Sequence, residues 1–271
     1  MARCGRGPVL PDLMSTAAPN LRQLTLPSSL LLLGAAGAWV GVVVLARRMG
    51  PMPGTMGVGV GTFVAVWALM MAAMIIPSVI PFASLYTRTL ADRRGGRLAA
   101  LLVGYLLVWT LAAAPAFGLA WLADRVIEGH PAAATAMAVV IFLACGLYQL
   151  TPLKDRCLAR CRSPLGFVLK FGSYRGRTRD LRVGLYHGGF CLACCWALMA
   201  LLVAFGLMNL AAMIVLAAIV LFEKTGPWGR PFSVALGLVA LALAVLVVFQ
   251  PHLAPGLQPA RPMGTNMGGM S

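Results

Sequence analysis

The sequence has few charged residues, and its acidic residues are much scarcer than its basic ones. Only 11% of the 271 residues are charged, with 7 acidic against 22 basic, whereas a soluble domain carries about 25% charged residues. Hydrophobic residues make up 60% of the chain and the mean hydropathy is +0.87. Apolar runs of about 20 residues recur, which is long enough to cross a bilayer, and they lack the alternation of barrel strands. The sequence therefore predicts an all-α fold, a polytopic transmembrane helical bundle.

Motifs for several kinds of chemistry are also missing. No Asp or Glu lies well inside a predicted span, although proton-coupled transporters and pumps usually place carboxylates there. The chain has no Walker motif, no Ser-His-Asp arrangement and no His-rich metal triad. We therefore expect that the protein is not an enzyme and that it does not use ATP by itself.

The apolar runs predict about seven hydrophobic helices. Five are expected at about 27–46, 57–85, 97–123, 131–150 and 232–249. Two more are expected between 185 and 222, as two spans or a re-entrant hairpin, because Gly206 and Asn209 predict a turn there. In the second helix, Pro77 and Pro81 are expected to interrupt the run. Flanking the helical domain (27–250) are a basic N-terminal arm (1–26) and a tail rich in Pro, Gly and Met (251–271).

Membrane topology explains the net charge of +15 better than binding to nucleic acid does. The basic residues lie in short loops between the apolar runs, as the positive-inside rule predicts for cytoplasmic loops. The loop at 151–186 carries nine basic and two acidic residues. We therefore predict that this loop and the N-terminus are cytoplasmic, that the lipid bilayer is a partner, and that nucleic acid is not.

Cysteines supply the main candidate site. Cys157 and Cys161 are four residues apart, and Cys191 precedes Cys194 and Cys195 by three and four residues. On helices, the members of each group share a face. Both groups are expected at the cytoplasmic ends of neighbouring segments, which does not suit a secreted disulfide framework. Thiolates bind soft ions such as Cu(I) and Zn(II), and the surrounding arginines are expected to lower the thiol pKa.

Methionines supply a second set of candidate ligands, namely Met70, Met74 and Met199. A thioether is neutral, so it can lie in lipid-buried sequence, and it binds Cu(I) but hardly Zn(II). Met52, Met56 and the methionines of the tail RPMGTNMGGMS could extend the series toward the outer side. Each methionine could equally be a packing residue.

Three functions are compatible with these residues. The favoured one is an integral membrane protein that binds a soft metal ion near the cytoplasmic face and transports it or passes it to or from a partner protein; Cu(I) is the favoured ion and Zn(II) is the alternative. An alternative is thiol–disulfide exchange, because CLAC (191–194) places a C-x-x-C motif at a helix start. A third is a structural subunit of a membrane complex, in which zinc joins two helices.

The chain resembles one bacterial family in four stretches: WALMMAAMIIPSVIPF (67–82), TPLKDRCLARCRSPLGF (151–167), GGFCLACCWALMALLVAFGLMNLAAM (188–213) and FEK (222–224). Over about 57–224 it is similar to domain of unknown function 2182, a family of predicted metal-binding integral membrane proteins, some with a copper-chaperone description. The resemblance implies metal binding in the bacterial inner (cytoplasmic) membrane. The residues that it implicates are Met70, Met71, Met74, Pro77, Pro81, Lys154, Cys157, Cys161, Cys191, Cys194, Cys195, Trp196, Met199, Met208, Asn209, Glu223 and Lys224.

Overall fold

The computed structural model describes residues 21–49, 54–88, 90, 94–129, 131–162 and 178–258, and no strand occurs in these ranges. The predicted all-α fold is confirmed. The helices are α1 (Leu21–Met49), α2 (Val60–Arg88), α3 (Arg94–Leu111), α4 (Ala113–Gly129), α5 (Pro131–Gln149), α6 (Pro152–Arg162), α8 (Arg179–Phe205), α9 (Leu210–Thr225) and α10 (Gly229–Phe249), followed by the short 3-10 helices η2 (Pro251–Leu253) and η3 (Pro255–Leu257).

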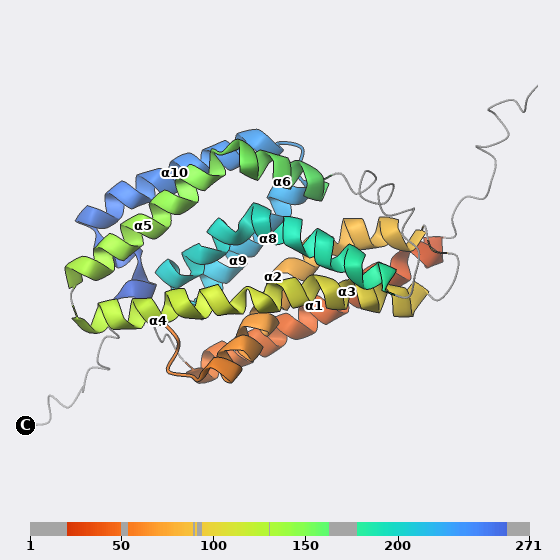
Figure 1. Ribbon diagram of the computed structural model, residues 1–271, viewed down its shortest axis with the longest axis horizontal. Coiled ribbons are helices and arrows are strands. Elements are labelled where there is room, and N and C mark those ends of the chain that lie inside the picture. The colour runs from red at the N-terminus through yellow and green to blue at the C-terminus, as the bar shows by residue number, and fades with distance from the viewer. Residues whose placement is uncertain are drawn as a thin grey trace, which may run out of the picture.

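Six helical segments of the described ranges are long and apolar enough to cross a membrane, which fits a multi-pass membrane protein. One of them, Gly95–Gly129, combines α3 and α4, which follow one another as a long rod in Figure 1. The 16 residues of α9 fall short of the roughly 20 that a crossing needs. Counting α9 with the six segments gives the seven hydrophobic helices that the sequence predicts.

Prolines affect the helices in two different ways. Pro115 has no N–H to donate to the carbonyl of Leu111, and α3 ends at Leu111. Pro77 and Pro81 lie inside α2, which continues from Val60 to Arg88, so the predicted interruption is wrong. Helices packed within membranes tolerate proline where neighbouring groups bind the freed backbone atoms.

The turn between α8 and α9 lies where the sequence predicts it. Gly206 has a φ of 95°, a conformation that favours glycine because it has no Cβ. Asn209 then begins α9, and its side-chain oxygen accepts a hydrogen bond from the N–H of Ala212 at 3.1 Å. From this turn α9 runs back along α8, so that Lys224 reaches Cys191. The segment is therefore a hairpin in which α8 alone has the length of a span.

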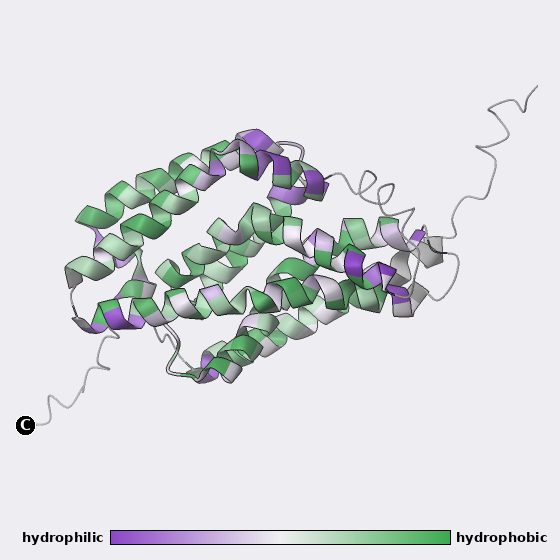
Figure 2. Cartoon of the chain, in the orientation of Figure 1, coloured by the Kyte–Doolittle hydropathy of each residue, from purple (hydrophilic) through white to green (hydrophobic). Residues whose placement is uncertain are grey.

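Helices α2 and α8 form the centre of the bundle. Of the 18 consecutive residues that form the most apolar stretch of each helix, 61% are buried in α2 and in α8, compared with 17% in α1. Figure 1 shows α5 beside α10 on one side of this centre and α1 on the other. Hydrophilic residues gather on α6 and the first turns of α8 (Figure 2). We call this region, with the neighbouring end of α2 and start of α3, the basic end of the bundle.

Glycines allow α3 and α8 to pack in backbone contact. A Cβ on Gly104 would lie 2.3 Å from the carbonyl oxygen of Leu181, and one on Gly184 would lie 2.0 Å from that of Leu101. Small residues at such positions let helices approach closely in membranes. The close approach matters for the site described below, because Tyr105 of α3 reaches a sulfur atom of α8.

We expect Gly184→Ala to destabilise the protein by about 1–3 kcal/mol, because the added methyl group must push two backbones apart. Gly189→Ala is the matched control, since a Cβ there meets nothing within 4 Å. That change should be neutral or stabilising by up to about 1 kcal/mol, through helix propensity alone. Thermal unfolding of both variants in detergent measures the difference, and equal stabilities would contradict the close packing of α3 on α8.

Candidate metal-binding site

Four thiol groups from two helices form a continuous series of sulfur–sulfur contacts. The Sγ of Cys161 on α6 is 3.8 Å from the Sγ of Cys194 on α8. Cys194 Sγ is 3.6 Å from Cys195 Sγ, which is 4.0 Å from Cys191 Sγ. The sulfur atoms therefore follow one another in the order 161, 194, 195, 191. We call these four residues the thiol chain.

Hydrogen bonds within α8 direct its sulfur atoms toward each other. Cys194 Sγ and Cys195 Sγ both donate to the carbonyl oxygen of Cys191, at 3.1 Å and 2.7 Å. This is the bonding to the preceding turn that short polar side chains make inside helices. It places three sulfur atoms on one face of α8, as the spacing of the cysteines predicts. All three residues are buried, with exposed fractions of 1% or less.

A buried ion pair joins α6 to α9. Lys154 Nζ donates to Glu223 Oε2 of α9 at 2.8 Å, and both side chains are almost fully buried. The other carboxylate oxygen, Oε1, accepts hydrogen bonds from Gln149 and Ser233. Arg162 donates to the carbonyl oxygen of Glu223. These bonds tie α6, which carries Cys161, to the ends of α5, α9 and α10.

The innermost sulfur atom, that of Cys191, has polar neighbours from two other helices. Lys224 Nζ of α9 donates to Cys191 Sγ at 2.8 Å and to Ser78 Oγ of α2 at 3.0 Å. The hydroxyl of Tyr105 lies 2.9 Å from the same sulfur. An ammonium group beside a buried sulfur stabilises its thiolate form, which is the form that binds metals.

Cys157, the other cysteine of α6, does not belong to the thiol chain. It is buried on α6, with 7% of its surface exposed, and its burial raises the pKa of its thiol, while Arg160 offsets part of that rise. Arg160 thus acts in the predicted direction, but the expected net lowering of the thiol pKa is wrong for Cys157, because losing contact with water disfavours a thiolate more than one exposed guanidinium favours it.

The four sulfur atoms of the thiol chain form a row and do not surround one common position. Within the described ranges, no group of three or more His, Cys, Asp or Glu side chains is placed so that it could hold a metal ion. The neighbouring pairs of the chain are nonetheless 3.6–4.0 Å apart. Two sulfur atoms bound to one ion at about 2.3 Å each can be no more than about 4.6 Å apart, so each neighbouring pair can share an ion.

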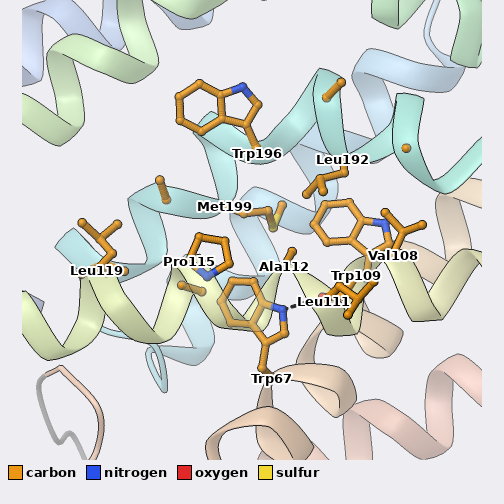
Figure 3. Close-up of a pocket in the computed structure, with 15 residues that line it drawn as sticks. Trp67, Val108, Trp109, Leu111, Ala112, Pro115, Leu119, Leu192, Trp196 and Met199 are labelled. Carbon is orange, nitrogen blue, oxygen red and sulfur yellow. Dashed lines mark hydrogen bonds between the residues drawn. The ribbon is translucent and has the colours of Figure 1, made fainter. Parts of the chain in front are cut away.

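The candidate methionines lie in the apolar core. Met70, Met74 and Met199 have exposed fractions of 1%, 1% and 2%. Figure 3 shows Met199 with Trp67 and Trp196 among the residues that line an apolar pocket. The pocket lies between α2, α3, α4 and α8 and has a volume of about 780 Å³. This burial is what packing alone predicts, and metal binding by these residues stays a prediction. Met52 and the tail methionines lie outside the described residues.

Sequence analysis missed two polar residues at the site: Tyr105, which contacts Cys191 Sγ, and Ser78, which contacts Lys224. Neither belongs to a motif, and each reaches the site only because its helix packs against α8 or α9. The glycines at positions 104, 184 and 188 form one signal that could have indicated Tyr105, because they predict a close contact of α3 with the cysteine helix. For Ser78, its place between Pro77 and Pro81 is the only signal in the sequence.

Together, the fold and the site define a polytopic helical protein with a buried group of thiols near its basic end. The chain belongs to the PpoB2 family, described as copper chaperone, whose model matches residues 64–247. The match supports a copper-related family without specific support for the name domain of unknown function 2182, and it extends past 224 to include most of α10. No curated protein and no solved structure matches the chain.

Proposed function

We propose that the protein binds Cu(I) at the thiol chain of α6 and α8 and passes it to or from a partner at the cytoplasmic face of the bacterial inner membrane. The observation that carries this proposal is the set of sulfur–sulfur distances of 3.6–4.0 Å between Cys161, Cys194, Cys195 and Cys191. The copper-related family supports the choice of metal. Copper here is cargo, and the thiolates are the soft ligands that suit it.

The surroundings of Cys191 favour a monovalent ion. Two thiolates and one Cu(I) carry a net charge of −1, which the ammonium of Lys224, 2.8 Å from Cys191 Sγ, balances. The same pair of thiolates with Zn(II) is neutral, so the ammonium of Lys224 would remain as an uncompensated charge of +1, which is costly in the membrane interior. For Zn(II), neither the family nor the contacts of the described residues adds support.

The test is an anaerobic titration of the purified protein with Cu(I) and, separately, with Zn(II), each in competition with a chromophoric chelator. We expect the parent to bind at least one Cu(I) per chain, and Cys191→Ser/Cys194→Ser/Cys195→Ser to bind none. Zinc bound in preference to copper would favour the structural alternative. A reversible disulfide without metal binding would favour thiol–disulfide exchange.

A further inference from the structure

The sulfur atoms of the thiol chain differ in how easily they can be reached. Cys161 is partly exposed, whereas the exposed fractions of Cys194, Cys195 and Cys191 are 1%, 1% and 0%. The order of the contacts follows the order of burial, since Cys161 touches Cys194 and Cys191 lies at the other end. An ion that enters or leaves from the aqueous side therefore meets Cys161 before any other sulfur of the chain.

Exposed arginines accompany Cys161 on α6. Arg156 and Arg160 are both exposed and lie one helical turn apart. The guanidinium of Arg160 lies 5.3 Å above the ring of Phe190 on α8, so it is held over the junction of the two helices that carry the thiol chain. Exposed positive groups beside a site raise the local concentration of anions and the rate at which they arrive.

We propose that Cys161 is the exchange ligand of this site, the sulfur at which Cu(I) is received from or returned to a small anionic Cu(I)–thiol complex guided by Arg156 and Arg160. The inference rests on the proposed function, since it assigns an order to the same sulfur atoms. Cys194, Cys195 and Cys191 then retain the ion, and Cys161 sets the rate of exchange.

Each transfer is a ligand exchange in which copper stays in the +1 state and no electron moves. On loading, a bond forms between Cu(I) and Cys161 Sγ while the bond from Cu(I) to the carrier sulfur breaks. The proton of the Cys161 thiol leaves with the departing carrier thiolate. A bond to Cys194 Sγ, 3.8 Å away, then forms, and the proton of the Cys194 thiol passes to Cys161 Sγ as the bond from Cu(I) to Cys161 breaks. Unloading follows the same steps in reverse.

The experiment measures the amount of copper retained and the rate of copper release separately, on the full-length protein in detergent under anaerobic conditions. Each variant is loaded with the Cu(I)–glutathione complex and desalted, and the copper that remains is counted. Bathocuproine disulfonate, a coloured anionic chelator, then removes the copper in a stopped-flow instrument. We expect Cys161→Ser to release the copper that it holds at least about tenfold more slowly than the parent, with each rate normalised to the copper retained, because the remaining sulfur atoms are buried.

Cys145→Ser is the matched control for the cysteine substitution. Cys145 is buried on α5 at the wall of a separate apolar pocket of about 370 Å³, so its replacement should leave retention and rate unchanged. An exchange rate of Cys161→Ser equal to or faster than that of the parent would overturn the inference while leaving the proposed function intact. A parent that retains no copper would refute the proposed function itself.

The role of the arginines has its own control at the opposite end of the bundle. Arg156→Gln/Arg160→Gln should slow exchange with the anionic chelator several-fold at low ionic strength and weaken its dependence on salt. Arg47→Gln/Arg48→Gln removes the same charge from two exposed residues of α1. It should change neither the exchange rate nor its dependence on salt. Equal effects of the two double variants would show that the overall charge of the protein, rather than the charge beside Cys161, guides the carrier.

Discussion

Lys154→Met is expected to lower the free energy of unfolding by about 3–5 kcal/mol, the cost of leaving one partner of a buried ion pair without the other. Lys154 has no exposed surface and Glu223 has 2%, and the two side chains are 2.8 Å apart. Without Lys154, the carboxylate keeps its hydrogen bonds from Gln149 and Ser233 but loses its counter-charge. Unfolding in detergent, followed by circular dichroism, measures the loss.

Two further variants distinguish the loss of the buried ion pair from other effects of replacing a charged residue by methionine. Arg230→Met breaks the exposed ion pair with Asp155 on the same side of the bundle and should cost less than about 1 kcal/mol. Lys154→Met/Glu223→Gln removes both buried charges and should recover part of the stability that the single change loses. A single variant as stable as the parent would contradict the account in which this pair holds α6 in place.

Cys194→Ser is expected to weaken Cu(I) binding more than any other single substitution in the thiol chain, by about 100-fold or more, which corresponds to about 2.7 kcal/mol. Cys194 is the link between the helices, because its sulfur contacts both Cys161 of α6 and Cys195 of α8. Serine preserves the size of the side chain and replaces a soft ligand by a hard oxygen. Competition with a chelator of known affinity measures the change.

The control for this prediction is Cys145→Ser, which makes the same chemical change at a buried cysteine outside the thiol chain. Its Cu(I) affinity should equal that of the parent. If both serine variants weaken binding equally, the effect comes from a hydroxyl group in the bundle core and not from a lost ligand.

Sequence patterns predict most of the fold because membrane spans are defined by length and hydropathy, which can be read locally. The turn at Gly206 and Asn209 is predicted correctly for the same reason, since glycine and a capping side chain act within a few residues. The continuity of α2 through Pro77 and Pro81 is not predictable in this way. Neighbouring helices decide whether a proline breaks a helix in a membrane, and a single sequence does not show them.

The candidate site is predictable in part. Helical spacing correctly predicts a shared face for Cys191, Cys194 and Cys195, and the contact between Cys161 and Cys194 follows from α6 folding back on α8. The ion pair between Lys154 and Glu223 joins residues 69 positions apart, and local sequence carries no signal for that pairing. Glu223 and Lys224, neighbours in the sequence, point to different partners, one holding α6 and the other contacting Cys191.

The central claim, that the thiols of α8 hold copper, is tested most directly by the metal content of anaerobically purified protein, measured by mass spectrometry. The parent is compared with Cys191→Ser/Cys194→Ser/Cys195→Ser, both prepared from copper-supplemented cells. The account predicts copper in the parent and its loss in the variant. Copper absent from both proteins, or equally present in both, would contradict it.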